Sequence, residues 1–313
     1  MRILFTGASS FSGMWIVKQL VAQGHRVTAI FKRPLADYFG IRGQRVQAVL
    51  PICNPVFNCT FGSQKFLEQI ENESSWDLFC HHAADVTNYK SPEFDVGKAV
   101  ANNVFHLKHV LEAFSRKHCK RVLLTGTVFE QNEGEGVHPL KAFSPYGLSK
   151  GVTSDIFRFY TEQLSMKLGK FVIPNPFGPY EEVRFTTYLI QKWFKKEVAM
   201  VSHPAYIRDN IHVSLLAKAY AQFAENLSDE AGFEKFNPSG YVESQGDFTS
   251  RFAAELRSRL GLPCEYELLM QTDFREPKER YNTGLLHDLE WSEQKAWDEL
   301  ASFYQQTYGE SHA

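Results

Sequence analysis

Residues 1–22 read MRILFTGASSFSGMWIVKQLVA, and this stretch decides the fold. An apolar run, RILFT (2–6), passes directly into the small residues TGASSFSG (6–13) and then into a helical pattern over 12–23. Gly7 permits a tight strand-to-helix turn, and Gly13 permits close packing of the helix on the strand. The start of such a helix offers free N–H groups and a positive dipole end to a pyrophosphate. The stretch therefore predicts a dinucleotide-binding unit, with a plain turn rich in small residues as the alternative.

One position of this loop departs from the usual glycine fingerprint, because Ser10 stands where the middle glycine is expected. A serine hydroxyl can still donate a hydrogen bond to a phosphate oxygen. We expect the cofactor loop to consist of Gly7, Ser9, Ser10, Phe11, Ser12 and Gly13.

The end of the second predicted strand, RVTAIF (26–31), indicates which dinucleotide is preferred. A carboxylate at this place accepts hydrogen bonds from the adenosine ribose and repels a 2′-phosphate. Here Phe31 occupies the place, and the cations Lys32 and Arg33 follow it. The pattern predicts NADP(H) in preference to NAD(H), with a solvated basic strand end as the alternative.

The first half of the chain alternates short apolar runs with amphipathic segments, which is typical of parallel βαβ units. This regular alternation ends near residue 175, where prolines stand at 174, 176 and 179. We predict a Rossmann-type doubly wound parallel sheet over 1–174 plus about 209–239, and a smaller α/β substrate domain over about 175–208 plus 240–313. Further strands are predicted at 46–50, 78–82, 121–125, 170–174 and 233–239, an extended segment at 264–269, and helices at 63–73, 97–117, 146–168, 208–226 (after a strand end), 247–260 and 292–308.

Composition excludes several classes of protein. The formal net charge of −2 over 313 residues gives no long-range field for nucleic acid or an acidic membrane. Five widely spaced cysteines without a CxxC pair predict neither a disulfide framework nor a zinc site, and we expect no metal. The N-terminus lacks the long apolar segment of a signal peptide, and no stretch is long enough to span a bilayer. We expect a cytosolic protein.

The segment FSPYGLSKG (143–151) places Tyr146 and Lys150 four residues apart, so they are neighbours on one helix face. A tyrosine phenol has a pKa near ~10, too high for a proton shuttle at neutral pH. A nearby ammonium, together with the positive ring of an oxidised nicotinamide, would lower that pKa. The pair predicts an acid/base site, with a half-buried helix face as the alternative.

Further motifs accompany this pair in a fixed order along the chain. Together with the glycine loop and the tyrosine–lysine segment, these motifs make the chain resemble the extended short-chain dehydrogenases/reductases of the sugar-nucleotide epimerase/dehydratase group. The resemblance rests on HHAAD (81–85), Asn103, LLTGTVFE (123–130), PNPFGPYEE (174–182) and RDNIHV (208–213), with FREPKERYN (274–282) as a weaker C-terminal match.

The resemblance implies a catalytic set. Thr125, with Thr127 as the fallback, orients the reacting substrate oxygen, Tyr146 is the acid/base, and Lys150 holds the nicotinamide ribose. The backbone of His81–Ala84 lines the cofactor, with the His81 side chain structural. The implied cofactor contacts beyond the loop are Lys32, Arg33, His81, Ala83, Tyr146 and Lys150.

The resemblance also implies a nucleotide-sugar site and a homodimer. Asn103 braces the active-site helix, and the helices predicted at 97–117 and 146–168 form the dimer contact. Glu130 and Phe129 depart from the family pattern, but no reacting group is lost. The implied substrate contacts are Thr127, Asn175, Arg208 and Arg275, with Arg280 as the alternative to Arg275.

A 4,6-dehydratase carries an Asp–Glu pair where this chain has Gly126 and Thr127, which speaks against dehydration. Four other interpretations remain open. Lys32 and Arg33 favour NADPH-dependent reduction of a 4-keto, possibly 6-deoxy, nucleotide sugar. A nucleotide-sugar 4-epimerase with bound NAD(P) is the alternative. Reduction of another carbonyl compound and a non-catalytic cofactor-binding relative rank below these.

Overall fold

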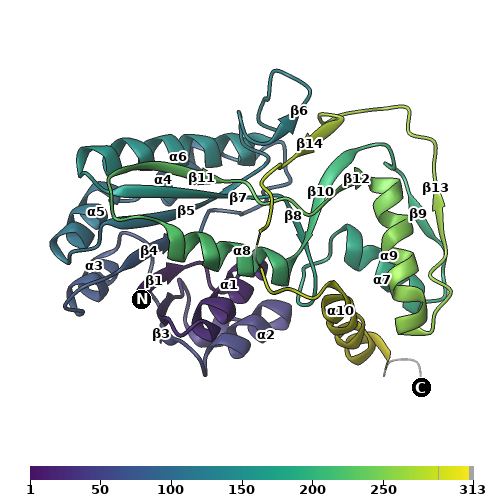
Figure 1. The fold of residues 1–313 in the computed structure, drawn as a ribbon, viewed down its shortest axis with the longest axis horizontal. Coiled ribbons are helices and arrows are strands. Elements are labelled where there is room, and N and C mark those ends of the chain that lie inside the picture. The colour runs from purple at the N-terminus through teal and green to yellow at the C-terminus, as the bar shows by residue number, and fades with distance from the viewer. Residues whose placement is uncertain (288, 310–313) are drawn as a thin grey trace.

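A seven-stranded parallel sheet forms the centre of the computed structural model, which describes residues 1–287 and 289–309. Its order is β11-β7-β5-β4-β1-β2-β3, so the order along the chain reverses between β1 and β4 (Figure 1). Parallel sheets of this kind bind ligands beyond the strand ends at that reversal. The strands are β1 (Arg2–Thr6), β2 (Arg26–Ile30), β3 (Asn54–Val56), β4 (Leu78–His81), β5 (Arg121–Thr127), β7 (Lys167–Ile173) and β11 (Gly232–Phe236).

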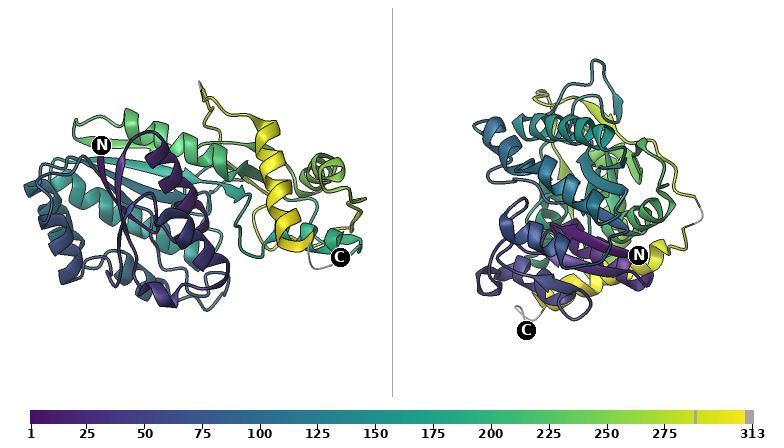
Figure 2. Two further views of the ribbon diagram at one scale, coloured as in Figure 1. Left: turned by 90° about the horizontal axis from the view of Figure 1, so that it is seen from below. Right: turned by 90° about the vertical axis from the view of Figure 1, so that its left-hand side faces the viewer.

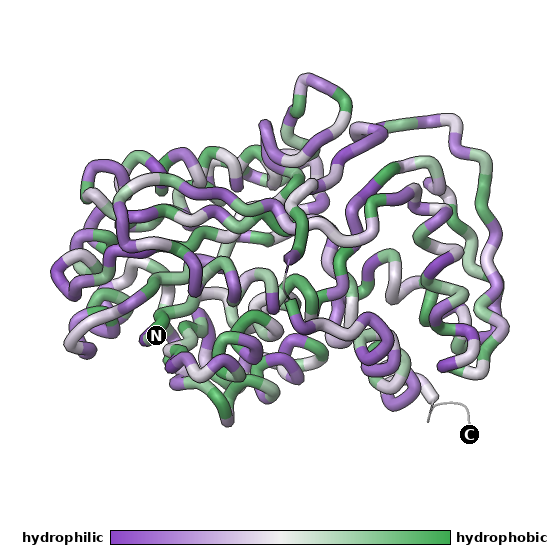
Figure 3. The backbone as a smooth tube through the Cα atoms, in the orientation of Figure 1, coloured by the Kyte–Doolittle hydropathy of each residue, from purple (hydrophilic) through white to green (hydrophobic). Residues whose placement is uncertain are grey.

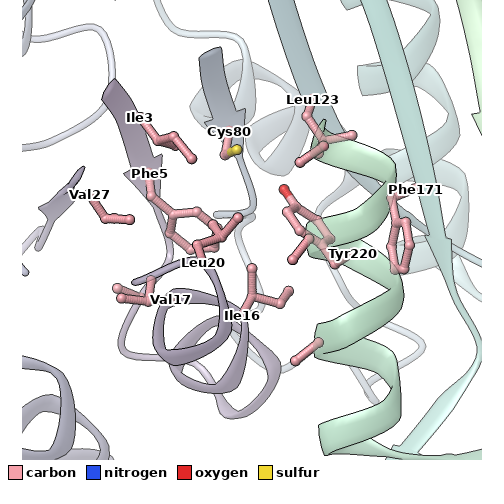
Figure 4. Close-up of a cluster of buried hydrophobic side chains, with 14 of the residues drawn as sticks. Ile3, Phe5, Ile16, Val17, Leu20, Val27, Cys80, Leu123, Phe171 and Tyr220 are labelled. Carbon is pink, nitrogen blue, oxygen red and sulfur yellow. The ribbon is translucent and has the colours of Figure 1, made fainter. Parts of the chain in front are cut away.

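Helices cover both faces of this sheet (Figures 1 and 2). On one face the core packs against α1 (Phe11–Ala22), α2 (Gly40–Val49) and α8 (Val213–Asn226). Figure 4 shows part of this core, where Phe5 of β1 and Tyr220 of α8 lie between the sheet and the helices. The other face carries α3 (Gln64–Glu71), α4 (Val96–Asn103), α5 (Leu107–Arg116) and α6 (Pro145–Gln163).

A second, smaller part extends from the carboxyl ends of the strands. Its central strand is β10 (Ile207–His212), which pairs with β8 (Asn175–Phe177), β12 (Tyr241–Ser244) and β14 (Glu279–Tyr281). β6 (Glu135–Gly136), from the loop after β5, adds to β14. The remaining elements are β9 (Ala199–Val201) paired with β13 (Tyr266–Leu268), and the helices α7 (Phe185–Phe194), α9 (Gln245–Leu260) and α10 (Glu293–Tyr308).

The helix α10 shows how this part is held together. Most of its residues are hydrophilic (Figure 3), yet five of them are buried at helical spacing along one face. All of them except Ala296 pack with α7 and α9 into a separate hydrophobic cluster. The five are Ala296, Trp297, Leu300, Ala301 and Tyr304.

The predicted fold class is confirmed, and two local predictions are wrong. Residues 46–49 form the end of helix α2 and Leu50 is its C-cap, because Val46 and Val49 share one buried helix face. The strand expected there is β3, an edge strand that tolerates Pro55 because one of its sides needs no hydrogen bonds. The helix expected over 97–117 is two helices, broken where His106 takes a left-handed φ of 52°.

In the described part of the chain, no helix is both long enough and apolar enough to cross a membrane. The homodimer stays a prediction. On α6, one of the helices expected to form the dimer contact, Phe157 is buried in the core. Phe159 is 55% exposed beside a hollow between α5 and α6.

Gly13→Ala should destabilise the fold. A Cβ at this position would lie 2.2 Å from the carbonyl oxygen of Gly7, so the helix would have to move off the strand. We expect a loss of about 1–3 kcal/mol in the free energy of unfolding. Gly97→Ala, in helix α4, is the control: its Cβ meets only an Asp95 oxygen at 3.6 Å and should be neutral or stabilising. Equal urea midpoints for the two variants would contradict the packing argument.

Candidate active site

Three adjoining cavities lie along the carboxyl ends of the sheet strands. The central cavity, of about 430 Å³, is walled by the glycine loop and by Thr125, Tyr146 and Lys150. The inner cavity, of about 200 Å³, lies beside Lys32 and Arg33. The outer cavity, of about 1120 Å³, is formed by the smaller part. Residues shared between neighbouring walls connect the three: Gly7, Arg42, Ala83, Ala84 and Val86 for inner and central, and Lys90, Val183 and Arg184 for central and outer.

The glycine loop is shaped by close backbone contacts. A Cβ on Gly7 would lie 2.8 Å from the nitrogen of Ala83, and its φ of +88° suits glycine. Ser10 caps α1: its Oγ accepts from the N–H of Gly13 at 3.1 Å and donates to the carbonyl of Gly7 at 2.9 Å. Its hydroxyl therefore stabilises the loop itself. Gly13 lies outside the walls of the described cavities and acts through packing.

The side chains predicted to be catalytic come from β5 and α6. Ser144 caps α6 and Pro145 opens it, which sets Tyr146 and Lys150 in its first turns. The Nζ of Lys150 donates to the carbonyl oxygen of Thr125 at 2.6 Å, and so joins the helix to the strand. Tyr146 lies edge-on to the rings of Tyr89 and Phe94.

The electrostatics of this pair differ from the sequence expectation. Burial raises the pKa of Tyr146 above its ordinary value, and the Glu130 carboxylate adds to the rise. Burial lowers the pKa of Lys150 to about 8. The protein groups therefore do not lower the pKa of Tyr146 by themselves. Among them the Arg184 cation lowers it, but the effect of burial is larger.

Glu130, which replaces a family glycine, is fully buried and compensated. Its carboxylate accepts from the N–H of Thr127 at 2.8 Å and from Lys170 at 2.6 Å. Lys170 also donates to Glu133 at 2.7 Å, and Glu133 pairs with Lys235. Since every charge in this network has a partner, it holds the chain that follows β5 without an isolated buried charge.

The three arginines proposed for phosphate differ in their contacts. Arg208 lines the outer cavity, but its guanidinium lies 4.4 Å from the Tyr206 ring centroid and pairs with Glu276 at 3.0 Å. A phosphate would have to replace Glu276. Arg275 lines the same cavity and is exposed, with an ion pair to Asp273.

Arg280, the alternative to Arg275, is not a phosphate contact. Its side chain is fully buried and lies outside the walls of the described cavities. Its Nη atoms donate to four backbone carbonyls, so they are already satisfied. These carbonyls belong to Val128, Glu130, Glu133 and Lys141.

The other predicted residues also have definite places. The ring of His81 lies between Phe61 and Phe157, with Nδ1 3.2 Å from the Thr6 hydroxyl, so its side chain is structural. Asn103 donates to Thr153 of α6 at 3.2 Å. The cavity walls hold most of the rest: Ser9, Lys32, Arg33, His81 and Ala83 in the inner cavity, and Ser10, Phe11, Ser12, Thr127 and Asn175 in the central one.

Sequence reasoning missed three polar residues at the site. Arg42 lines both the inner and central cavities and donates to Ser9 Oγ at 3.1 Å. Arg184 lines the central and outer cavities, and its Nε is buried without a partner among the described residues. His82 contacts Thr125. Only His82 lay inside a quoted motif, while the two arginines carried no sequence signal because their place depends on tertiary contacts.

The residues present fit a pyridine dinucleotide. Phe11 and Ser12, whose N–H groups precede the first intrahelical hydrogen bonds of α1, line the central cavity beside Gly7, where the loop backbone lies close to Ala83, just after β4. Within residues 1–287 and 289–309, no group of three or more His, Cys, Asp or Glu side chains is arranged to hold a metal ion.

The fold and this site define an NAD(P)-dependent enzyme of the extended short-chain dehydrogenase/reductase type. A family model, the NAD dependent epimerase/dehydratase family, matches residues 3–237. The chain belongs to that family. No curated protein matches the sequence.

Solved structures with this fold include several sugar-nucleotide epimerases. A mutant UDP-glucuronic acid 4-epimerase from Bacillus cereus, in complex with UDP-4-deoxy-4-fluoro-glucuronic acid and NAD, is 17% identical with a TM-score of 0.77, over 98% of this chain and 100% of that one. UDP-glucose 4-epimerase from Thermus thermophilus, in complex with NAD, is 17% identical with a TM-score of 0.72, over 97% and 99%. UDP-N-acetylglucosamine 4-epimerase from Methanobrevibacter ruminantium is 16% identical with a TM-score of 0.74, over 98% of each chain.

The lowered pKa of Lys150 predicts a pH-dependent affinity for the cofactor. Lys150 carries its charge below about pH 8 and loses it above that pH. Since the ammonium is the better donor to the ribose, NAD⁺ and NADP⁺ affinity should fall by up to about tenfold between pH 7 and pH 9. Lys150→Met should bind more weakly and independently of pH, whereas exposed Lys98→Met should behave as the unmodified protein. Calorimetric titrations showing a flat profile for the unmodified protein would refute the assignment.

Proposed function

We propose that this enzyme is a nucleotide-sugar 4-epimerase. The observation that carries the proposal is the shared wall between the central and outer cavities, formed by Lys90, Val183 and Arg184. A nucleoside diphosphate in the outer cavity can therefore place its sugar in the central cavity beside Tyr146. The solved structures above, which are described as 4-epimerases in complex with UDP-sugars or NAD, support the same reading.

Cationic side chains around these cavities support an anionic substrate. Arg184 has a buried Nε without a hydrogen bond among the described residues, at the junction where a diphosphate would pass. An unsatisfied guanidinium N–H is costly unless a ligand accepts from it. Arg275 and Arg208 lie further out, and Asn175 lies on the central side. We propose Arg184 as the first phosphate contact, with Arg208 and Arg275 as the outer ones.

The residues of the central cavity have separate tasks in this reaction. A bound nicotinamide supplies hydride chemistry at carbon 4 of the sugar. Tyr146 takes the proton of the 4-hydroxyl group and returns it after the ring has turned over. Thr125 donates a hydrogen bond to the same oxygen in both states, which keeps it beside Tyr146. Lys150 holds the nicotinamide ribose and the Thr125 carbonyl.

The two parts of the chain have separate tasks in this proposal. The larger domain, proposed as 1–174 plus about 209–239, supplies the loop and the catalytic pair. The smaller one, proposed as about 175–208 plus 240–313, supplies the outer cavity. Gly126 and Thr127 offer no carboxylate pair for dehydration, and a Cβ at Gly126 would lie 2.8 Å from Lys170 Cε, so a larger residue there would require Lys170 to shift.

NADPH-dependent reduction of a 4-keto nucleotide sugar, which the sequence favoured, is the second candidate. The solved structures support the epimerase better, since those named above are 4-epimerases. One observation still favours the reductase: Arg42 joins Lys32 and Arg33 around the inner cavity. Three cations there would attract a 2′-phosphate.

The first experiment incubates the protein and either NAD⁺ or NADP⁺ with UDP-glucose, UDP-glucuronic acid and UDP-N-acetylglucosamine in turn, and measures the 4-epimer by proton NMR. We expect epimerisation of at least one. Tyr146→Phe should lower kcat at least about 100-fold, because no proton donor or acceptor is left beside the oxygen. Tyr160→Phe, the same change on the outer side of α6, is the matched control.

Two results would decide against the epimerase. One is the absence of any 4-epimer together with stoichiometric NADPH oxidation by a 4-keto nucleotide sugar, which would establish the reductase. The other is the absence of a 4-epimer from every sugar nucleotide with either oxidised dinucleotide. A Tyr146→Phe variant that keeps the unmodified rate would instead remove Tyr146 from the mechanism.

Cofactor preference can be tested separately. We propose that NADPH binds more tightly than NADH, because Lys32, Arg33 and Arg42 surround the inner cavity. Arg42→Ala should weaken NADPH binding by on the order of tenfold, since a charge-assisted hydrogen bond contributes about 1.5–3 kcal/mol, and leave NADH unchanged. Lys32→Ala with Arg33→Ala should erode the preference further. Arg26→Ala, at the opposite end of β2, is the control. Equal fluorescence-titration affinities for the two dinucleotides in the unmodified protein would refute the preference.

A further inference from the structure

A buried histidine links the catalytic threonine to the glycine loop. The Nδ1 of His82 lies 2.9 Å from the hydroxyl of Thr125, and its Nε2 lies 3.1 Å from the hydroxyl of Ser12. These three side chains come from different elements: the end of β4, the strand β5 and the first turn of α1. All three line the central cavity. One imidazole therefore spans the gap between the cofactor loop and the group that contacts the substrate oxygen.

The packing around His82 fixes the plane of its ring. Phe5 of β1 stacks on it at a centroid distance of 5.5 Å, and Tyr220 of α8 meets it edge-on at 6.4 Å; both rings are drawn in Figure 4. The side chain of His82 is 8% exposed. Burial, together with the nearby Lys150 ammonium, lowers the pKa of His82 to about 3. The ring is therefore neutral at physiological pH, with one nitrogen that donates and one that accepts.

A neutral ring in this place determines how the Thr125 hydroxyl is used. If Nδ1 carries the hydrogen, it donates to Thr125 Oγ1, and the hydrogen of Thr125 is left to donate elsewhere. If Nδ1 accepts, the hydrogen of Thr125 is taken up by the histidine and the substrate oxygen loses its donor. Only the first arrangement suits an oxygen that passes between hydroxyl and carbonyl while Tyr146 exchanges its proton.

We propose that His82 is a positioning residue for the reaction: Nδ1–H donates to Thr125, Nε2 accepts from Ser12, and the Thr125 hydrogen is thereby aimed at the substrate oxygen. The claim that His82 raises the reaction rate rests on the proposed function. The claim that His82 carries its hydrogen on Nδ1 does not. Through Ser12, the direction of the Thr125 hydroxyl is also tied to the position of the cofactor loop.

The tautomer can be measured on the unmodified protein. Nitrogen-15 NMR of protein labelled at histidine distinguishes Nδ1–H, Nε2–H and imidazolium forms, and the His82 signals are identified by their loss in His82→Asn. We expect the neutral Nδ1–H form. An Nε2–H or imidazolium form would overturn the proposal whether or not any sugar nucleotide is turned over.

Matched variants test the role of each ring nitrogen. An asparagine amide reaches the place of Nδ1, and a glutamine amide reaches the place of Nε2. His82→Asn should therefore retain most of kcat, while His82→Gln and His82→Leu should lose roughly 10- to 100-fold. The loss should fall on kcat, with the KM for the sugar nucleotide little changed. Equal losses in His82→Asn and His82→Leu would reduce His82 to a packing role.

A double-mutant cycle tests whether His82 acts through Thr125. Thr125→Val removes the hydroxyl that His82 orients, so adding His82→Leu should slow single-turnover hydride transfer no further. Multiplicative losses in the double variant would overturn the proposal. If the unmodified protein turns over no sugar nucleotide, the proposed function fails and the NMR measurement alone decides the tautomer.

Discussion

The contact of the glycine loop with its surroundings is the constraint on which the rest of the structure depends. Gly7 and Gly13 bring the loop, the helix α1 and the end of β4 to distances at which no Cβ could be placed. That contact brings the first turn of α1 beside the end of β4, and therefore Ser12 beside His82. Since Thr125 lies in the neighbouring strand β5, a shift of α1 would also displace the glycine loop relative to Thr125.

Buried charged groups support the other side of the same site. Glu130 stands where the family pattern has glycine, and Lys170 beside it restores neutrality. Arg280, from the last strand of the smaller sheet, holds the segment after β5 through its carbonyls. The catalytic strand is therefore braced by residues from three separate parts of the chain. Each of these polar groups would be costly alone, so the departure from glycine was accommodated as a network.

The distribution of cations follows the order in which a bound dinucleotide and a sugar nucleotide would meet. Lys32, Arg33 and Arg42 lie around the inner cavity, and Arg184 lies at the junction of the central and outer ones. Between them the groups that face the central cavity include hydroxyls and a neutral imidazole. With a net charge of only −2, the protein attracts anions through these local clusters rather than through a long-range field.

The sequence by itself determined the sheet class, the glycine loop and the pair Tyr146–Lys150, because each depends on neighbours within a turn or a strand. It placed a strand at 46–50 wrongly, because a short, largely apolar run such as VQAVL is compatible with a buried strand or a helix until the packing of α2 decides. Only the tertiary structure decided the roles of the arginines. Arg280 became a structural residue and Arg184 a residue of the cavity junction, because burial and hydrogen-bond partners are set by segments distant in the sequence.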